Sequence, residues 1–331
     1  MNTPGISVII CCYNATARLE KTLRALQLQQ FTGTRPAWEL IVVDNASTDG
    51  TAAEARRIWS SQPVVPLQVV QEPTPGLMHA RKKGLATASF SLISFIDDDN
   101  RVEPYWVEKV WSTLSSDERI AACGGRCEGE FEEQMPDWFP RYENSFAVGR
   151  QMPQSGFIDE TRGFLWGAGL SFRKSCWDEL EAQGFKPLTL GREGDKITAG
   201  EDSELCYAFR LLGYKLYYRD DLWLKHHMPP GRMNLAYLEK MYLGFGQSQA
   251  RLSAYRLLLE PGFQLRPWWY EWGAARKRIL RLKRILKKEG PASGLISTRV
   301  QLAYDRGYAQ QVWRDKSKIR DTIKSLRALM K

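Results

Sequence analysis

The stretch Ser91-Leu-Ile-Ser-Phe-Ile-Asp-Asp-Asp-Asn100 joins an apolar run directly to three aspartates. The apolar run predicts a buried strand, and the abrupt change to Asp97 predicts where that strand ends. Three adjacent carboxylates at the end of a buried strand repel one another unless a cation lies among them. The run is therefore a candidate site for a divalent cation with oxygen ligands, such as Mg²⁺ or Mn²⁺. A solvated acidic turn, in which one aspartate caps a helix, is the structural alternative.

Strand and helix patterns alternate in the residues before this stretch. Further strands are predicted over 6–12, 39–44 and 67–71, and helices over 15–29, 49–59 and 76–88. This order predicts an α/β fold with a mostly parallel sheet. Ligands of such sheets bind at the carboxyl ends of the strands. The polar residues that end the predicted strands are therefore binding candidates: Tyr13, Asn14, Asp44, Asn45 and Asp97 to Asn100.

Composition places the chain among globular proteins, with 43% hydrophobic and 26% charged residues in a length of 331. The six cysteines form no CxxC pair and lack zinc-site spacing, which predicts buried, reduced thiols and a reducing compartment. No secretory signal opens the chain, and no apolar run reaches the roughly 18 residues of a spanning helix. We therefore expect a cytoplasmic protein, or one peripheral on the cytoplasmic face of a membrane.

Positive charge is concentrated at the end of the chain. Residues 266–331 contain 18 Lys and Arg against 5 Asp and Glu, a net charge of +13, whereas residues 1–265 carry −4 of the total +9. Within 266–288 a narrow stripe of Trp272, Ala275, Ile279, Leu282 and Leu286 lies along an otherwise basic helical pattern. Such a helix can lie on an anionic membrane surface, or its stripe can pack on the rest of the protein. No nucleic-acid-binding motif accompanies the charge, so we expect no nucleic-acid partner.

Several blocks of sequence resemble glycosyltransferase family 2 in their order and spacing. Asp97-x-Asp99 resembles the DxD signature of nucleotide-sugar-dependent transferases, and the other matching blocks are Ile9–Asn14, Val42–Thr51, Pro75–Gly84, Gly169–Arg173 and Gly200–Leu205. The resemblance implies a GT-A fold, a Rossmann-like mostly parallel sheet flanked by helices. It predicts a catalytic domain over 1–235, with a nucleotide-binding half (1–120) and an acceptor half (121–235). A helical, basic C-terminal region over 236–331 follows.

The resemblance implies donor-binding roles for residues near the strand ends. Asp44 would bind the nucleobase, although a cap on the following helix is the alternative. Arg81 would face the diphosphate, because a guanidinium matches phosphate geometry, unless it is an exposed helix arginine. Asp97 would contact the ribose or the donor sugar, and Asp99 would bind Mn²⁺ or Mg²⁺. The complete set implied for the donor is Cys12, Tyr13, Asn14, Asp44, Asn45, Arg81, Asp97, Asp98 and Arg232.

Glu201-Asp202 matches an acidic pair of the family. An inverting transfer needs a base that takes the proton of the acceptor hydroxyl, and the resemblance assigns this role to Asp202, with Glu201 beside it. Without the resemblance, the two acids would be read as first-turn residues that complement a helix dipole.

Three further predictions concern the middle of the chain. His227 and Arg232 lie in a segment that resembles a His-x-Pro-Pro-x-Arg block of family relatives, which implies a metal ligand and a partner for the leaving diphosphate. A surface histidine in a turn is the alternative for His227. Trp166 is a candidate for sugar-ring contact on the acceptor side, with a core position as its alternative.

Together these features predict an inverting, metal-dependent transferase that moves a sugar from a nucleoside-diphosphate sugar, with UDP as the default nucleotide. The expected acceptor is a glycan or lipid-linked saccharide of surface polysaccharide or glycoconjugate synthesis. The competing hypotheses are an inactive GT-A scaffold or membrane-surface module, and a nucleotidyltransferase. The latter would favour a glycine-rich loop after the first strand, and Cys11-Cys-Tyr-Asn-Ala15 is not one.

Overall fold

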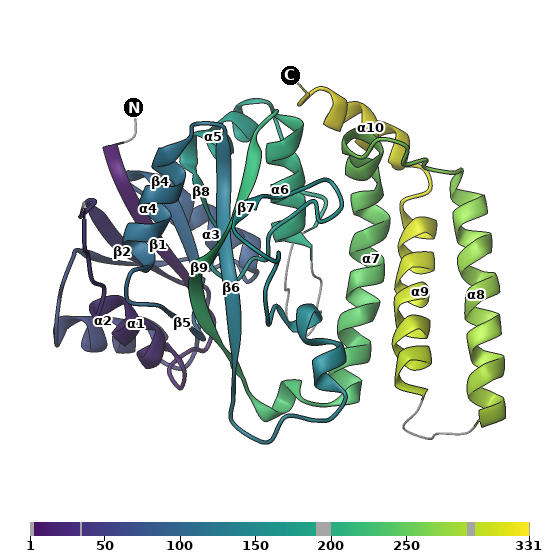
Figure 1. Cartoon of the computed structure of the whole chain (residues 1–331), viewed down its shortest axis with the longest axis horizontal. Helices are drawn as coiled ribbons and strands as arrows, with labels where there is room; N and C mark the ends of the chain where they lie inside the picture. Colours follow the sequence, from purple (N-terminus) through teal and green to yellow (C-terminus); the bar gives the residue numbers. More distant parts are fainter. Residues whose placement is uncertain (1–2, 34, 190–199, 290–294, 331) are drawn as a thin grey trace. The chain divides into compact units, whose positions relative to one another are not determined.

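The computed structural model describes residues 3–33, 35–189, 200–289 and 295–330, which form two compact units. Unit 1 comprises Met1–Phe185 and Tyr214–Met228, and unit 2 comprises Lys186–Gly213 and Pro229–Lys331. Unit 1 holds the β-sheet and unit 2 is helical (Figure 1). The predicted domain boundary at residue 235 stays a prediction.

The first half of the sheet is parallel, as the alternating pattern predicted. Its strands are β1 (Thr3–Cys12), β2 (Trp38–Asp44), β3 (Leu67–Gln71) and β4 (Phe90–Asp97), in the spatial order β3-β2-β1-β4. Both faces of β1 and β2 are buried, which explains their nearly continuous apolar sequences. Helices α1 (Leu19–Gln27), α2 (Thr51–Ser60) and α3 (Leu77–Thr87) connect these strands. The α/β prediction is confirmed for this half.

The second half of the sheet is mixed. Beyond β4 the order is β8 (Ser171–Arg173), β6 (Ile120–Phe131), β9 (Lys215–Met228) and β5 (Asn100–Val102), and β7 (Gly156–Phe157) pairs with β9. β8 is antiparallel to β4 and β6, whereas β6 and β9 are parallel. The remaining elements of unit 1 are α4 (Trp106–Ser116), η1 (Phe139–Arg141), η2 (Glu143–Phe146) and α5 (Lys174–Ala182).

A buried tryptophan joins the two halves of the sheet. Trp106 of α4 is 1% exposed, and its indole N–H donates to Ser94 Oγ of β4 at 3.0 Å. A Cβ at Gly169 would lie 2.5 Å from the Trp106 ring, and Gly169 has φ +73°, so only glycine fits there without rearrangement. Gly169 opens the predicted Gly169–Arg173 block, which therefore has a packing role beside β8.

Unit 2 contains α6 (Glu201–Leu211), η3 (Pro230–Arg232), α7 (Leu235–Leu259), α8 (Trp268–Glu289), α9 (Ile296–Arg314) and α10 (Ile319–Arg327). α9 lies between α7 and α8, as Figure 1 shows. The helical prediction for the C-terminal region is confirmed. Among the described residues, none of these helices combines the length and apolar character that crossing a bilayer requires.

Two glycines bring α7 and α9 into backbone contact. A Cβ at Gly246 would lie 2.0 Å from the Tyr304 carbonyl oxygen, and a Cβ at Gly307 would lie 2.0 Å from the Leu243 carbonyl oxygen. Any larger residue would therefore force the helices apart. This reciprocal close approach explains why glycines, which weaken helices by about 1 kcal/mol, occur within both.

Candidate donor-binding site

The carboxyl ends of β1, β2 and β4 lie side by side in unit 1. The register pairs Cys12 with Asp44 and Cys11 with Asp97. Asp44 is 6% exposed and accepts a hydrogen bond from the Ser47 amide at 3.1 Å, so it also stabilises the turn after β2. Two carboxylates predicted from separate motifs thus meet at one edge of the sheet.

The three aspartates differ in their surroundings. Asp98 forms a two-point ion pair with Arg18, with Arg18 Nε to Oδ1 and Nη2 to Oδ2 both at 2.7 Å. Thr22 of α1 also donates to the Asp98 carbonyl oxygen at 3.1 Å. Asp98 is therefore tied to α1, which gives it a positioning role that the sequence did not reveal.

Arg18 is a residue at this edge of the sheet that the sequence did not single out. Besides Asp98, its guanidinium donates to the carbonyl oxygens of Asn14 at 2.8 Å and Tyr13 at 2.9 Å. One side chain therefore connects the loop after β1 with the aspartates after β4. Asp98 and Arg18 are 80 positions apart, so no local pattern signals the pair.

The oxygen atoms after β4 fit a hard divalent cation. Asn100 is fully buried, and its Nδ2 donates to Asp97 Oδ2 at 3.3 Å. The Asn100 Oδ1 is buried without a hydrogen-bond partner among the described residues. Asp99 is 8% exposed, and its carbonyl oxygen accepts from the His227 amide at 3.3 Å.

In the described parts of the chain, no group of three His, Cys, Asp or Glu side chains is arranged to hold a metal. Mg²⁺ sites in proteins generally use one or two carboxylates and complete their coordination with water and substrate phosphate. The imidazole Nε2 of His227 contacts Glu132 Oε1 at 2.7 Å. Pairing of β5 with β9 nevertheless places the His227 backbone next to Asp99.

The loop after β1 presents an aromatic ring at this edge. Tyr13 is 57% exposed, which is unusual for a tyrosine between two buried segments. Asn14 has φ +49°, and its Oδ1 accepts from the Thr48 amide at 2.9 Å. Its own amide donates to Ser47 Oγ at 3.0 Å. Asn14 thus holds the loops after β1 and β2 together and leaves the Tyr13 ring accessible.

Asn45 supports the segment that leads into α3. Its Nδ2 donates to the carbonyl oxygens of Glu72 at 3.1 Å and Thr74 at 2.6 Å, and its Oδ1 accepts from the Gly76 amide at 2.8 Å. An aspartate at this position would lack the two N–H donors. The amide of Asn45 therefore has a structural role in this segment.

Arg81 is buried in α3 rather than exposed on it. It is 8% exposed, and its guanidinium carbon lies 5.2 Å from the centre of the Phe95 ring. Burial raises the pKa of the Cys11 thiol to about 12. The positive charge of Arg81 lowers this pKa, and the negative charge of Asp97 raises it. Arg81 and Asp97 therefore lie within electrostatic range of the same thiol at the strand edge.

Asp49 stabilises the turn before α2 by accepting hydrogen bonds from Thr16 and Thr51. Partial burial acts to raise the pKa of Asp49, but hydrogen bonds from Thr51 and Thr16 outweigh it and lower the pKa to about 2. Its Oδ2 accepts from the Thr16 amide at 3.1 Å and from the Thr16 hydroxyl at 2.8 Å. Asp49 remains ionised at neutral pH and connects α2 to the loop after β1.

The two predicted catalytic acids begin α6 in unit 2. Gly200 precedes them with φ +108°, and a Cβ there would lie 2.9 Å from Ser248 of α7. Glu204, one turn further on, is 1% exposed and accepts from the Leu188 amide at 2.7 Å and the Tyr255 hydroxyl at 2.7 Å. Glu201 and Asp202 are half-buried at the start of α6, and one carboxylate oxygen of Glu201 is buried.

Trp166 lies in the hydrophobic core. It is 7% exposed, packs in the main hydrophobic cluster of the sheet, and its amide donates to Gln151 Oε1 at 2.8 Å. Its ring is covered on one side by the Arg162 guanidinium, at 5.2 Å. These contacts fit the core position given as the alternative, and the acceptor role of Trp166 stays a prediction.

Arg232 lies in η3 of unit 2 and is half-buried.

This sheet order, with the helical C-terminal region, defines the GT-A fold of nucleotide-sugar-dependent transferases. The mannosyltransferase PcManGT of Pyrobaculum calidifontis, solved with GDP-Man and Mn²⁺, is similar with a TM-score of 0.57 over 94% of this chain and 88% of that one, at 18% identity. The model of glycosyl transferase family 2 matches residues 7–177. The chain belongs to glycosyl transferase family 2.

Curated relatives support the family and differ in coverage. Glycosyltransferase AglE of Haloferax volcanii is 31% identical over 112 residues, 34% of this chain and 36% of that protein. The succinoglycan biosynthesis protein ExoM of Rhizobium meliloti is 25% identical over 254 residues, 76% of each chain. The chain spans about a third to a half of the length of the first curated relatives that it matches.

Proposed function

We propose that this glycosyltransferase is an inverting enzyme that depends on a divalent cation, Mn²⁺ or Mg²⁺, and uses a nucleoside-diphosphate sugar. The observation that carries the proposal is the meeting of Tyr13, Asp44 and Asp97 to Asn100 at the carboxyl ends of β1, β2 and β4. In parallel sheets this edge is where nucleotides bind. Membership of family 2 makes a nucleotide sugar the ligand to test first.

Each group at the edge has a proposed part in holding the donor. Asp44 accepts from the nucleobase, and the exposed Tyr13 ring offers it an apolar face. Asp97 takes the ribose or the sugar, and Arg81 balances the diphosphate. Asn45, Asn14 and Asp98 act through the loops that they hold.

The proposed cation site consists of Asp99 and the buried oxygen of Asn100, with His227 as a further ligand. When bound, the cation would neutralise the phosphate oxygens of the departing nucleoside diphosphate. Arg232 is proposed to add positive charge to the leaving group, because a guanidinium binds phosphate oxygens in two places.

Asp202 is the proposed base. Its carboxylate takes the proton of the acceptor hydroxyl as that oxygen bonds to C1 of the sugar, and the bond from C1 to the diphosphate oxygen breaks with inversion. Glu201 is proposed to bind the acceptor beside it. The acceptor class we propose is a glycan or lipid-linked saccharide, because ExoM and other relatives are named for polysaccharide biosynthesis.

We also propose that the basic C-terminal region attaches the protein to an anionic membrane, on its cytoplasmic face. The catalytic part in this proposal is residues 1–235, and the helical region 236–331 supplies the attachment. The net charge of +13 over residues 266–331 supports this division of roles.

A thermal-shift panel tests the donor and the cation together. The protein is melted with UDP, GDP or dTDP, each with and without Mn²⁺, and one nucleotide is expected to stabilise it only when Mn²⁺ is present. UDP is the default, and GDP is the alternative because PcManGT was solved with GDP-Man. Asp99→Ala is expected to remove the shift, whereas Asp321→Ala, an exposed carboxylate on α10, is expected to leave it unchanged. No shift with any nucleotide would contradict the proposal and favour an inactive scaffold.

A further inference from the structure

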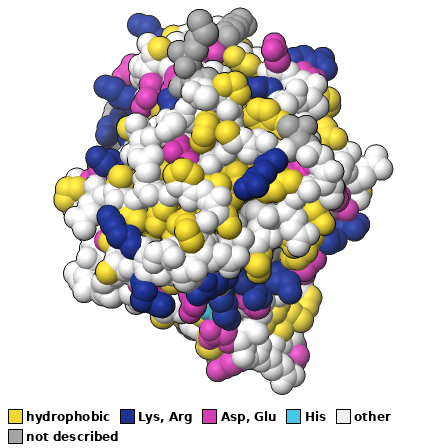
Figure 2. All heavy atoms as spheres, turned by 90° about the vertical axis from the view of Figure 1, so that its left-hand side faces the viewer, with side chains coloured by type: hydrophobic (Ala, Val, Ile, Leu, Met, Phe, Trp, Pro, Cys, Tyr) yellow, Lys and Arg dark blue, Asp and Glu magenta, His cyan; other side chains and the backbone are white. Residues whose placement is uncertain are grey.

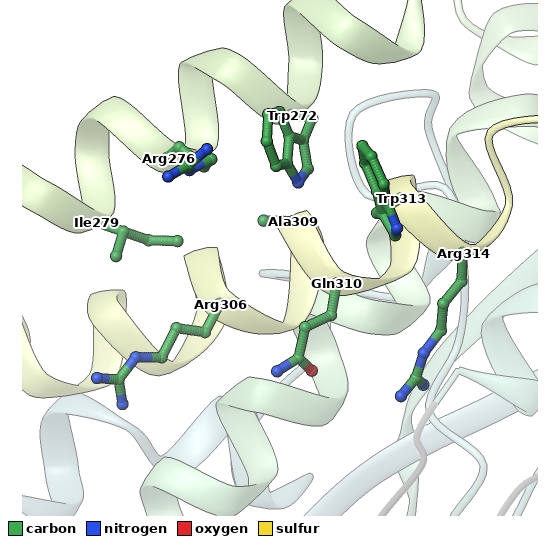
Figure 3. Close-up of a pocket in the computed structure, with 8 residues that line it drawn as sticks. All are labelled: Trp272, Arg276, Ile279, Arg306, Ala309, Gln310, Trp313 and Arg314. Atoms are coloured by element: carbon green, nitrogen blue, oxygen red, sulfur yellow. The ribbon is translucent and has the colours of Figure 1, made fainter.

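A groove between α8 and α9 lies outside the proposed donor site. Its volume is about 440 Å³, and its lining alternates aromatic or aliphatic side chains with arginines. Figure 3 shows Trp272 and Arg276 extending from α8 toward α9, with Trp313 of α9 beside Trp272. Arg306, Gln310 and Arg314 come from α9. The groove belongs to unit 2 alone.

The apolar part of the groove is a cluster of tryptophans. The Trp272 and Trp313 rings lie 5.1 Å apart at 35°, and the Trp268 ring meets Trp313 at 5.6 Å, nearly edge-on. Trp313 is still 45% exposed. These rings connect the beginning of α8 to the end of α9 and leave an indole surface open to solvent.

The cations around this cluster lack acidic partners. Among the described residues, none of Arg276, Arg306 and Arg314 forms an ion pair with a carboxylate. Arg276 lies over the Trp272 ring at 4.6 Å, and Lys316 lies over Trp313 at 3.7 Å. Aromatic faces therefore hold the charges of Arg276 and Lys316, and no carboxylate of the described residues neutralises the charges of Arg306 and Arg314.

Three other arginines of the same bundle are paired, whereas Arg281 and Arg284 of α8 form no ion pair among the described residues. Arg278 binds the buried Asp305 at 2.9 Å, Arg299 binds Glu239 at 2.5 Å, and Arg256 binds Glu260 at 2.8 Å. Paired arginines thus join helices or stabilise one helix, whereas the groove arginines do neither. No ion pair within the described part of the protein accounts for the charge of the groove arginines.

Exposed apolar residues also gather on these helices. Of the nine large apolar side chains that are exposed in the described ranges, four lie on α8 or α9, namely Trp269, Tyr270, Leu280 and Trp313. Tryptophan and tyrosine favour the boundary between lipid headgroups and acyl chains. A basic helix with such residues is typical of proteins that lie in the membrane interface.

We propose that the α8–α9 groove binds the phosphate headgroup of an anionic membrane lipid. The first carbons of the lipid pack on Trp272 and Trp313 in the groove, and the three arginines around it, Arg276, Arg306 and Arg314, attract the anionic headgroup. The inference rests on the membrane attachment proposed above and adds a defined site to it. A nucleic acid would also meet the positive charge, but exposed Trp269 and Leu280 favour a surface with an apolar interior.

The experiment compares two triple variants of the full chain that remove the same charge. The groove variant is Arg276→Gln, Arg306→Gln and Arg314→Gln; the control is Arg281→Gln, Lys283→Gln and Arg284→Gln on α8, which do not line the groove. Co-sedimentation is measured with phosphatidylcholine vesicles, with and without phosphatidylglycerol. Binding should require phosphatidylglycerol, and the groove variant should lose at least tenfold more affinity than the control. All six positions are exposed, so both variants should keep the native far-UV spectrum.

Several results would contradict the proposal that the groove binds a lipid headgroup. Equal losses in the two triples would mean that charge alone attracts the membrane. Protection by millimolar inorganic phosphate, or tighter binding of an RNA oligonucleotide that also depends on the groove arginines, would assign the groove to a free anion or to nucleic acid. The absence of vesicle binding in the unmodified protein would remove membrane attachment as well. The nucleotide-dependent thermal shift is independent of these readouts, so failure of the lipid site is distinguishable from failure of the donor assignment.

Discussion

The strand edge of unit 1 and the α8–α9 groove of unit 2 use arginine in opposite ways. At the strand edge, Asp98 neutralises Arg18, which also donates hydrogen bonds to two carbonyl oxygens. At the groove, Arg276, Arg306 and Arg314 have no carboxylate partner among the described residues. Charge at the edge therefore fixes loop geometry around carboxylates, whereas charge at the groove is directed outward. The face drawn in Figure 2 carries basic side chains at several places and a group of basic and acidic side chains toward its lower end.

The largest effect is expected from Asp202. Asp202→Ala should lower sugar transfer by about 10²- to 10⁴-fold, because the acceptor hydroxyl loses its base. The nucleotide-dependent thermal shift should remain, since Asp202 is not proposed to bind the donor. Initial rates of nucleoside-diphosphate release measure the effect. Full activity of this variant would remove the assignment of the base.

Gly307 tests how the helical unit is assembled. Gly307→Ala places a methyl group 2.0 Å from the Leu243 carbonyl oxygen and should destabilise the protein by about 3 kcal/mol. Gly273→Ala in α8, where the new methyl meets nothing within 4 Å, should instead be neutral or stabilise by up to about 1 kcal/mol. Urea unfolding followed by circular dichroism compares them. Similar stability of the two variants would contradict the close crossing of α7 and α9.

The next prediction concerns the ion pair between Arg18 and Asp98 at the strand edge. A double-mutant cycle with Arg18→Leu and Asp98→Asn should give a coupling energy of about 1 to 2 kcal/mol. The ion pair contains two hydrogen bonds, and the Asp98 side chain is only 12% exposed. Each single variant should also weaken nucleotide binding, because the loop after β1 loses its anchor. An additive cycle would show that the pair does not couple the two loops.

Asn45 gives a smaller, local effect. Asn45→Asp removes both N–H donors to Glu72 and Thr74 and should cost about 1 to 2 kcal/mol. Gln134→Glu makes the same change at an exposed amide and should be nearly neutral. Denaturant midpoints measure both. If Asn45→Asp is also neutral, the amide does not hold the segment before α3.

The smallest expected effect concerns Cys11. Burial raises its pKa to about 12, so the thiolate needed for alkylation is scarce below pH 9. Iodoacetamide should therefore modify Cys11 much more slowly in the native protein than in the unfolded chain when both are kept at pH 8. Mass spectrometry of the Cys11 peptide follows the reaction, and rapid alkylation of the native protein would contradict the raised pKa of Cys11.

Local sequence predicted the strands and the residues that follow them. The strand over 67–71 is observed with those bounds, and the predicted 39–44 strand becomes β2 at Trp38–Asp44. Helix ends were less well predicted: the helix expected over 15–29 is α1 at Leu19–Gln27, because Ala15 and Asn14 are used in turn hydrogen bonds. Apolar runs and turn residues act over a few positions, which is why these features can be read from sequence.

Long-range pairings could not be predicted in this way. No periodicity indicates that β8 inserts antiparallel between β4 and β6, or how the apolar stripe of α8 packs. Ala275 of that stripe is fully buried, while Ile279 lines the groove with Trp272. One residue of the stripe therefore packs inside the helical unit, and another lines an open groove. The position of the neighbouring helix decides which residue does which.

The triple aspartate shows the division most clearly. Sequence alone determined that a carboxylate run follows a buried strand in an α/β chain of family 2, because strand patterns and motifs are local. Only the tertiary structure decided which aspartate does what: Asp98 turns to Arg18 of α1, Asp97 meets Asn100, and the Asp99 backbone joins β9 through His227. These roles depend on side chains that are distant in sequence, and only folding brings their charges and hydrogen-bonding groups within a few ångströms.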